Sequence, residues 1–184
     1  MFFSVFLLVL IVLLLIMLTF VWPPDSPWAP RWRTRRSDAR KALKLASLSK
    51  NDTLYELGCG DGEVILSAAQ DFGSQAVGIE IDPTRFFISK FRVWRNGMSK
   101  KVTVVRKDFK KIDLSAATVV YMYLVPAALK RNLPKLKDEL RTGAKILSYR
   151  YRIPLDKNEK NIVFEKEDKR AKVYLYTVKS TGMH

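Results

Sequence analysis

Three glycines at alternate positions mark the place where this sequence could do chemistry. Gly58, Gly60 and Gly62 follow a short strand-like segment, Thr53–Leu57, and precede residues 63–71, whose apolar side chains have helical spacing. In doubly wound sheets ligands bind at such strand-to-helix turns, and glycine lets them approach the backbone closely. The expected cofactor contacts at this turn are Gly58, Cys59, Gly60 and Gly62.

The residues beside the turn indicate which cofactor would bind. A dinucleotide fingerprint would place its third glycine at position 63, which is Glu63. Glu56, just before the turn, would repel a pyrophosphate and attract a cationic amino group. The turn therefore favours S-adenosylmethionine over nicotinamide and flavin cofactors.

The next two strands end in residues that could complete such a site. Glu80 lies about 20 residues beyond Gly58, the spacing expected of an acid that accepts hydrogen bonds from ribose hydroxyls. After the following strand, Asp108 could accept from the adenine amine and Phe109 could cover the face of the ring. The second group of expected cofactor contacts is Glu80, Ile81, Asp82, Asp108 and Phe109.

Strands alternate with helices along most of the chain. This alternation predicts an α/β fold with a Rossmann-like, doubly wound, mostly parallel seven-stranded sheet. The expected strands are 53–57, 75–81, 101–105, 118–123, 144–149, 161–164 and 172–178, the last two forming a C-terminal antiparallel hairpin. The expected helices are 37–48, capped by Ser37, then 63–71, 83–94 and 127–140.

Composition narrows the class of protein. The 184 residues include one Cys and one His, so neither a disulfide-stapled module nor a metal site is expected. With 48% hydrophobic residues the chain is too apolar for a disordered basic tail. Its net charge of +15 favours docking on an anionic membrane surface. A groove that binds nucleic acid is a more specific alternative explanation of this charge.

The N-terminal segment is apolar and uncharged from Phe2 to Trp22. Its length matches the ~20 residues that a helix needs to cross a bilayer, and it lacks the basic start and cleavage site of a secretory signal. We therefore expect a transmembrane anchor over residues 1–22, a Pro/Arg-rich juxtamembrane linker over 23–36 and the folded domain over 37–184. Six Lys and Arg residues between 31 and 41 predict a single-pass membrane protein whose domain faces the cytoplasm or its organellar equivalent.

These motifs resemble those of the class I, seven-stranded S-adenosylmethionine-dependent methyltransferases, over nearly all of residues 51–178. More narrowly, the sequence is similar to the small membrane-anchored protein-lysine methyltransferases that act on the mitochondrial ATP synthase c subunit and adenine nucleotide translocase, and to their prokaryotic relatives. The class-wide motifs are Glu56-Leu57-Gly58-Cys59-Gly60-Asp61-Gly62 and residues 76–83. The narrower ones are Arg92-x-Trp94-Arg95-x-Gly97, Tyr123-x-x-Pro126 and Arg150-Tyr151-x-x-Pro154.

The resemblance implies transfer of a methyl group from S-adenosylmethionine to a lysine of a membrane protein. Such an enzyme must hold an uncharged amine about 3–3.5 Å from the methyl carbon, and an apolar channel beside a sulfonium favours the neutral amine. Tyr123 is expected to line that channel and Pro126 to shape its loop. Because the domain is strongly basic, we expect an isolated lysine near the lipid surface rather than a lysine-rich tail.

Two other functions stay open. An anchored enzyme would equally suit a lipid or quinone substrate, and the basic surface would suit RNA, although nucleic acid is not the expected partner. Adenine or glutamine methylation is disfavoured because Tyr123-Leu124-Val125-Pro126 stands where those enzymes carry Asn or Asp followed by Pro-Pro-Tyr. A cysteine-nucleophile mechanism is disfavoured because Cys59, the single Cys, lies in the cofactor turn.

Overall fold

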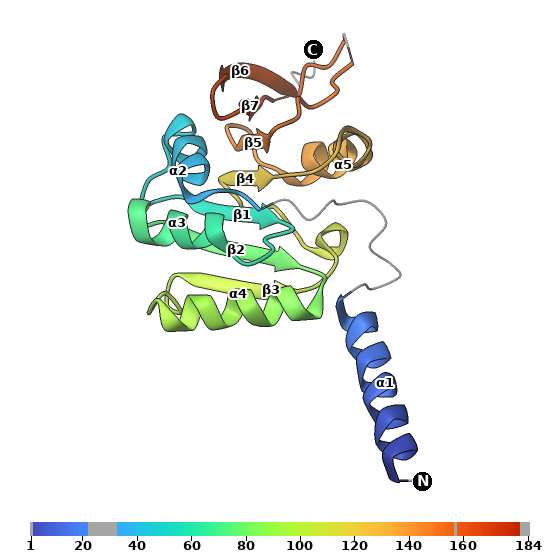
Figure 1. Cartoon of the computed structure of the whole chain (residues 1–184). Helices are drawn as coiled ribbons and strands as arrows, with labels where there is room; N and C mark the ends of the chain where they lie inside the picture. Colours follow the sequence, from blue (N-terminus) through green and yellow to red (C-terminus); the bar gives the residue numbers. More distant parts are fainter. Residues whose placement is uncertain (1, 22–32, 157, 181–184) are drawn as a thin grey trace.

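A seven-stranded sheet forms the centre of the domain in the computed structural model, which describes residues 2–21, 33–156 and 158–180 (Figure 1). The strand order is β3-β2-β1-β4-β5-β7-β6. The parallel strands are β1 (Thr53–Leu57), β2 (Gln75–Glu80), β3 (Val102–Arg106), β4 (Val119–Met122) and β5 (Lys145–Tyr149), and the antiparallel hairpin is β6 (Ile162–Asp168) and β7 (Val173–Val178). The predicted α/β fold, with its mostly parallel seven-stranded sheet and C-terminal hairpin, is confirmed.

Helices cover both faces of this sheet. One apolar cluster joins α2 (Arg36–Leu45), α3 (Glu63–Phe72) and α4 (Pro83–Arg95) to one face, and a second joins α5 (Pro126–Glu139) and the 3₁₀ helix η1 (Phe109–Lys111) to the other. In β4, Val119 and Tyr121 belong to the first cluster, whereas Val120 and Met122 belong to the second. Because successive side chains of a strand point to opposite faces, burial on both faces requires the continuous apolar runs seen in the sequence.

The order in which strands are added to the sheet reverses between β1 and β4, although the two strands are parallel. From β1 the chain builds outward through β2 and β3, then returns to place β4 on the other side of β1. Leu57 pairs with both Ile79 and Met122, so the loops after β1, β2 and β4 leave the sheet at the same edge. Such a reversal opens the crevice in which doubly wound sheets bind ligands.

The predicted ends of α2 and β6, at residues 48 and 164, differ by three and four residues from the structure, whereas the other predicted boundaries agree within one residue. The predicted cap Ser37 lies inside α2, which begins at Arg36 after Arg35 with no side-chain cap. Strand β6 continues through the charged residues to Asp168, with an irregularity between Phe164 and Lys166. Backbone pairing with β7 does not require apolar side chains at an edge, so hydropathy alone placed the end of β6 too early.

The apolar N-terminal segment forms α1 (Phe2–Val21). Within the part of the chain that the structure describes, no helix combines the length and the apolar character needed to cross a membrane. The predicted transmembrane helix over 1–22, and with it the localisation as a single-pass membrane protein facing the cytoplasm, is thereby contradicted. Most of the predicted linker, residues 22–32, lies outside the described residues.

Candidate functional site

The turn after β1 uses backbone conformations that glycine adopts without strain. Gly58, Gly60 and Gly62 have φ angles of +82°, +54° and +80°. A Cβ added at Gly58 or Gly60 would meet no atom of the described residues within 4 Å, whereas one at Gly62 would lie 2.5 Å from the Oγ of Ser89. Gly58 and Gly60 therefore border open space where a ligand can reach the backbone, while Gly62 allows α3 and α4 to pack closely.

Glu80 ties this turn to the end of β2. Its buried Oε2 accepts a hydrogen bond from the Gly60 N–H at 2.8 Å, and its Oε1 accepts from the N–H groups of Ile81 and Asp82, each at 2.9 Å. Three backbone donors stabilise the charged carboxylate away from water. Since each carboxylate oxygen has two lone pairs, Glu80 keeps acceptor capacity for the hydroxyls of a ribose.

Two side chains of the glycine motif point into the domain. Glu56 is 5% exposed, and its Oε2 has no hydrogen-bond partner among the described residues. Burial raises the pKa of Glu56 well above its ordinary 4.5, although a hydrogen bond from the Ile65 N–H acts in the opposite direction. Cys59 is also buried, with Sγ 3.9 Å from the Oγ of Ser89, and burial raises the pKa of its thiol. Glu56 thus presents an acceptor that an ammonium group would satisfy, whereas Cys59 has its backbone to offer.

The ends of β2 and β3 place the other predicted cofactor contacts along the same edge. Asp82 caps α4 by accepting from the Arg85 N–H at 2.9 Å, and the neighbouring Ile81 is 50% exposed. Asp108 caps η1 by accepting from the Lys110 N–H at 3.0 Å, and Phe109 packs partly against the apolar cluster of α5. Both aspartates therefore have structural roles besides any contact with a cofactor.

Three tyrosines form an aromatic group at the ends of β4 and β5. The rings of Tyr123 and Tyr149 meet edge to face at 4.8 Å, and Tyr121 stacks on Tyr149 at 6.4 Å. Tyr121 and Tyr149 are buried, whereas Tyr123 is partly exposed and burial raises the pKa of its hydroxyl. Pro126, exposed, is the first residue of α5. Tyr123 is thus the member of the group that a substrate could reach.

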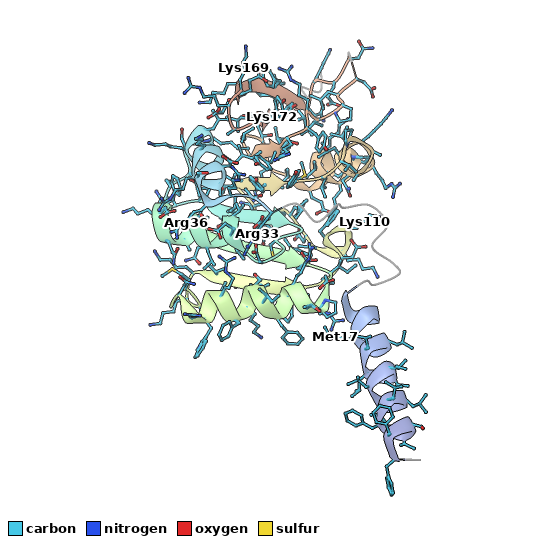
Figure 2. All side chains as sticks on the ribbon, in the orientation of Figure 1. Met17, Arg33, Arg36, Lys110, Lys169 and Lys172 are labelled. Carbon is cyan, nitrogen blue, oxygen red and sulfur yellow. The ribbon has the colours of Figure 1, made fainter. Side chains whose placement is uncertain are left out.

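Residues 33–38 cross this edge, and the sequence analysis missed them as site residues. The Oδ2 of Asp38 accepts from the Tyr149 hydroxyl at 2.9 Å, and the hydroxyls of Thr34 and Tyr121 are 3.3 Å apart. Arg33, labelled in Figure 2, pairs with Asp61 in the glycine turn. These partners lie 28 to 111 positions away in the sequence, so no local pattern could have identified them.

Arg92 of α4 fastens the same turn from the other side. Its guanidinium donates to the carbonyl oxygen of Asp61 at 2.6 Å and to the Oε2 of Glu63 at 2.7 Å. The arginine of the Arg-x-Trp-Arg motif therefore holds α4 against the cofactor turn. Over the described ranges, no cluster of His, Cys, Asp and Glu could hold a metal ion.

Comparison with known proteins identifies relatives of this chain. Residues 56–160 match the model of a family described as the ANTKMT methyltransferase domain. A protein-lysine N-methyltransferase of Saccharolobus islandicus is 34% identical over 156 residues, which cover 84% of this chain and 95% of that protein. A lysine N-methyltransferase of Xenopus laevis, named for the ATP synthase c subunit, is 30% identical over 70% of this chain, and the match spans about half, 54%, of that protein.

A solved structure with a bound ligand has the same fold as this chain. It is an RNA methyltransferase of Salinibacter ruber in complex with S-adenosyl-L-homocysteine, with a TM-score of 0.73 and 29% identity. The alignment covers 81% of this chain and 95% of that one.

We predict that Glu80→Ala loosens the glycine turn and weakens the binding of S-adenosylhomocysteine. The change removes three hydrogen bonds from backbone N–H groups to a charged acceptor, so the dissociation constant should rise at least about tenfold. Isothermal titration calorimetry measures it. Asp113→Ala is the matched control, because Asp113 accepts two hydrogen bonds from Ser115 outside the site. Equal affinities of the two variants would contradict the assignment of Glu80.

A second prediction concerns the bond between α2 and the aromatic group. Asp38→Ala and Tyr149→Phe should each lower the free energy of unfolding by about 1–3 kcal/mol, since each removes the hydrogen bond to a charged acceptor. The double variant should lose little more than the more affected single variant, because the two residues share one interaction. Urea unfolding measures this cycle, with Lys41→Ala, at an exposed position of the same helix, as the control. Fully additive losses would show that Asp38 and Tyr149 are not coupled.

Proposed function

Because the chain belongs to the family of the ANTKMT methyltransferase domain, we propose that it methylates a lysine side chain of a protein. It is an S-adenosylmethionine-dependent methyltransferase. The observation that most supports a lysine substrate is the similarity to the protein-lysine N-methyltransferase of Saccharolobus islandicus, 95% of whose length is covered.

The residues at the carboxyl edge fit the cofactor. Gly58 and Gly60 border open space, and the Oε2 of Glu56, which none of the described residues hydrogen-bonds, offers an acceptor for an amino group. Glu80 would accept from ribose hydroxyls, while Asp108 and Phe109, at the end of β3, would receive the adenine. Glu56, Glu80 and Asp108, whose carboxylates would accept from the amino group, the ribose and the adenine, lie at the ends of the adjacent strands β1, β2 and β3.

Positioning is the main task of the protein in this reaction. When bound, S-adenosylmethionine supplies an electrophilic methyl group on a sulfonium. Tyr123, partly exposed beside the ring of Tyr149, would line the approach of the lysine and exclude water. An apolar channel beside Tyr123 would disfavour the ammonium form, so the lysine would give its proton to solvent before it meets the methyl group. The methyl carbon would then exchange its bond to sulfur for a bond to the lysine nitrogen, and S-adenosylhomocysteine would leave. No side chain has to act as a strong base.

The charge of the chain limits the kind of lysine it would accept. A net charge of +15 disfavours a segment with several lysines, so we propose an isolated lysine. We keep as part of this proposal the expectation that the protein substrate is associated with a membrane. The test must also allow for RNA, because the related Salinibacter ruber structure is that of an RNA methyltransferase.

The proposal predicts methyl-lysine as the product. The purified full chain would be incubated with methyl-labelled S-adenosylmethionine and an extract of its source cells that includes the membranes. Label should become soluble on protease digestion and appear as methyl-lysine after acid hydrolysis. Label released by nuclease would instead identify RNA as substrate, and label in the organic phase would identify a lipid or quinone.

Variants of Tyr123 test its place in this site. Tyr123→Ala should lower kcat about 10- to 100-fold while changing cofactor affinity little, because a lysine without the ring beside it is poorly oriented. Tyr123→Phe should keep most of the activity, since the ring rather than the hydroxyl makes the contact. An equal loss in both variants would mean that the hydroxyl is required, contrary to this prediction.

The buried Glu56 predicts release of a proton when the cofactor binds. Its raised pKa keeps the carboxyl protonated at mildly acidic pH, above the ordinary value of 4.5, whereas an ammonium group beside it favours the carboxylate. Binding should therefore release part of a proton and should strengthen as the pH rises. Calorimetry in two buffers of different ionisation enthalpy measures the release, which should disappear in Glu56→Gln. The same proton count in both proteins would show that Glu56 does not receive the amino group.

A further inference from the structure

The outer side of α4 carries large apolar side chains that no part of the described domain covers. Phe87, Ile88, Phe91 and Trp94 are 63%, 45%, 54% and 68% exposed. The opposite side of the same helix is fixed to the sheet by the buried Ser89 and Val93. With about 3.6 residues per turn, Phe87, Phe91 and Trp94 form a single stripe along the helix. This stripe is called the α4 surface below.

Cations flank the α4 surface on both sides. Lys90 lies beside the stripe on one side and Arg95 on the other, and both are exposed. The sequence of α4 contains no Asp or Glu. A surface that is aromatic in the middle and basic at its borders complements a layer that is apolar inside and anionic outside.

From this arrangement we propose that the α4 surface docks on an anionic lipid bilayer, with Phe87, Phe91 and Trp94 entering the interface and Lys90 and Arg95 contacting the head groups. A second copy of this chain is the poorer occupant, because two α4 surfaces would place cations opposite cations. A single helix side is also convex, unlike the grooves in which strands of nucleic acid stack on aromatic rings.

Two further features agree with a bilayer at this position. The chain has a net charge of +15, which adds long-range attraction to an anionic layer. Helix α1 contacts α4 (Figure 1). The described side chains of α1 are all exposed, and all but Ser4 are apolar. The apolar surface thus continues from α4 to α1.

This docking would leave the candidate active site accessible. Asp82 caps the end of α4 that lies at the carboxyl edge of the sheet, while the α4 surface faces away from the sheet. A bilayer along α4 would therefore lie beside the cofactor turn and not over it. Lipid docking is independent of the chemistry proposed above, since it requires neither cofactor nor substrate.

The test places a fluorescent probe on the α4 surface of the full chain. Phe91→Cys would be labelled with the environment-sensitive NBD fluorophore, and the native Cys59 should escape labelling because it is buried. Lys169→Cys is the matched control, because Lys169 lies at the end of the molecule opposite α4 (Figure 2). Trp94→Cys provides a second reporter on the same stripe, and far-UV circular dichroism verifies the fold of each variant.

Vesicles of phosphatidylcholine and phosphatidylserine at about 7:3 should shift the emission of probes at 91 and 94 to the blue and increase its intensity, without effect at 169. Pure phosphatidylcholine or high salt should weaken the response. Phe91→Ser/Trp94→Ser should reduce vesicle partitioning at least about tenfold, whereas Val163→Ser, on the exposed side of β6, should not. Vesicle binding without any change at 91 and 94 would overturn the proposal, as would a response of these probes to RNA or protein concentration but not to vesicles.

Discussion

A buried carboxylate connects the loops at the carboxyl ends of β1 and β2, where the candidate cofactor site lies. Glu80 binds the N–H of Gly60, which follows β1, and those of Ile81 and Asp82, which lead into α4. The Ile79 carbonyl just before it accepts from both Gly58 and Cys59 at 2.9 Å. These hydrogen bonds from the turn to Ile79 and Glu80 of β2 hold the glycine turn in its conformation with positive φ angles and open space beside it. The cofactor contacts proposed at the glycine turn depend on that connection.

The segment of residues 33–38 adds a second part to the candidate site. Through Thr34 and Asp38 it bonds to the hydroxyls of Tyr121 and Tyr149, and through Arg33 it pairs with the glycine turn. Tyr123 in turn rests against the ring of Tyr149. The chain that precedes the sheet therefore determines the position of the ring nearest to the expected substrate, in addition to covering the core. Asp38 of α2 therefore supports the aromatic group that Tyr123 contacts, besides the packing of α2 on the sheet.

Sequence periodicity predicted the strands and helices well because both faces of the sheet are buried, which leaves clear apolar runs such as β4. The glycine motif likewise predicted the tight turn after β1, since the conformations of that turn depend on local residue types. The contacts of Thr34 and Asp38 could not be predicted, because they join residues 87 and 111 positions apart. The N-terminal helix α1 was predicted wrongly for a different reason. Hydropathy indicates that its side chains avoid water but does not indicate what they pack against, and the predicted transmembrane helix is contradicted.

The net charge of the chain and the charge of its site have opposite signs, which removes an apparent conflict in the proposed function. Glu56 and Glu80 lie at the cofactor turn together with Asp61 and Glu63, and Arg33 and Arg92 pair with the latter two. At physiological ionic strength interactions between exposed charges fade beyond about 8 Å, so distant lysines hardly affect a ligand in the turn. A cationic cofactor at this turn would therefore be governed by the nearby carboxylates. The surplus of positive charge acts instead at the outer surface, where it would favour an anionic bilayer against α4.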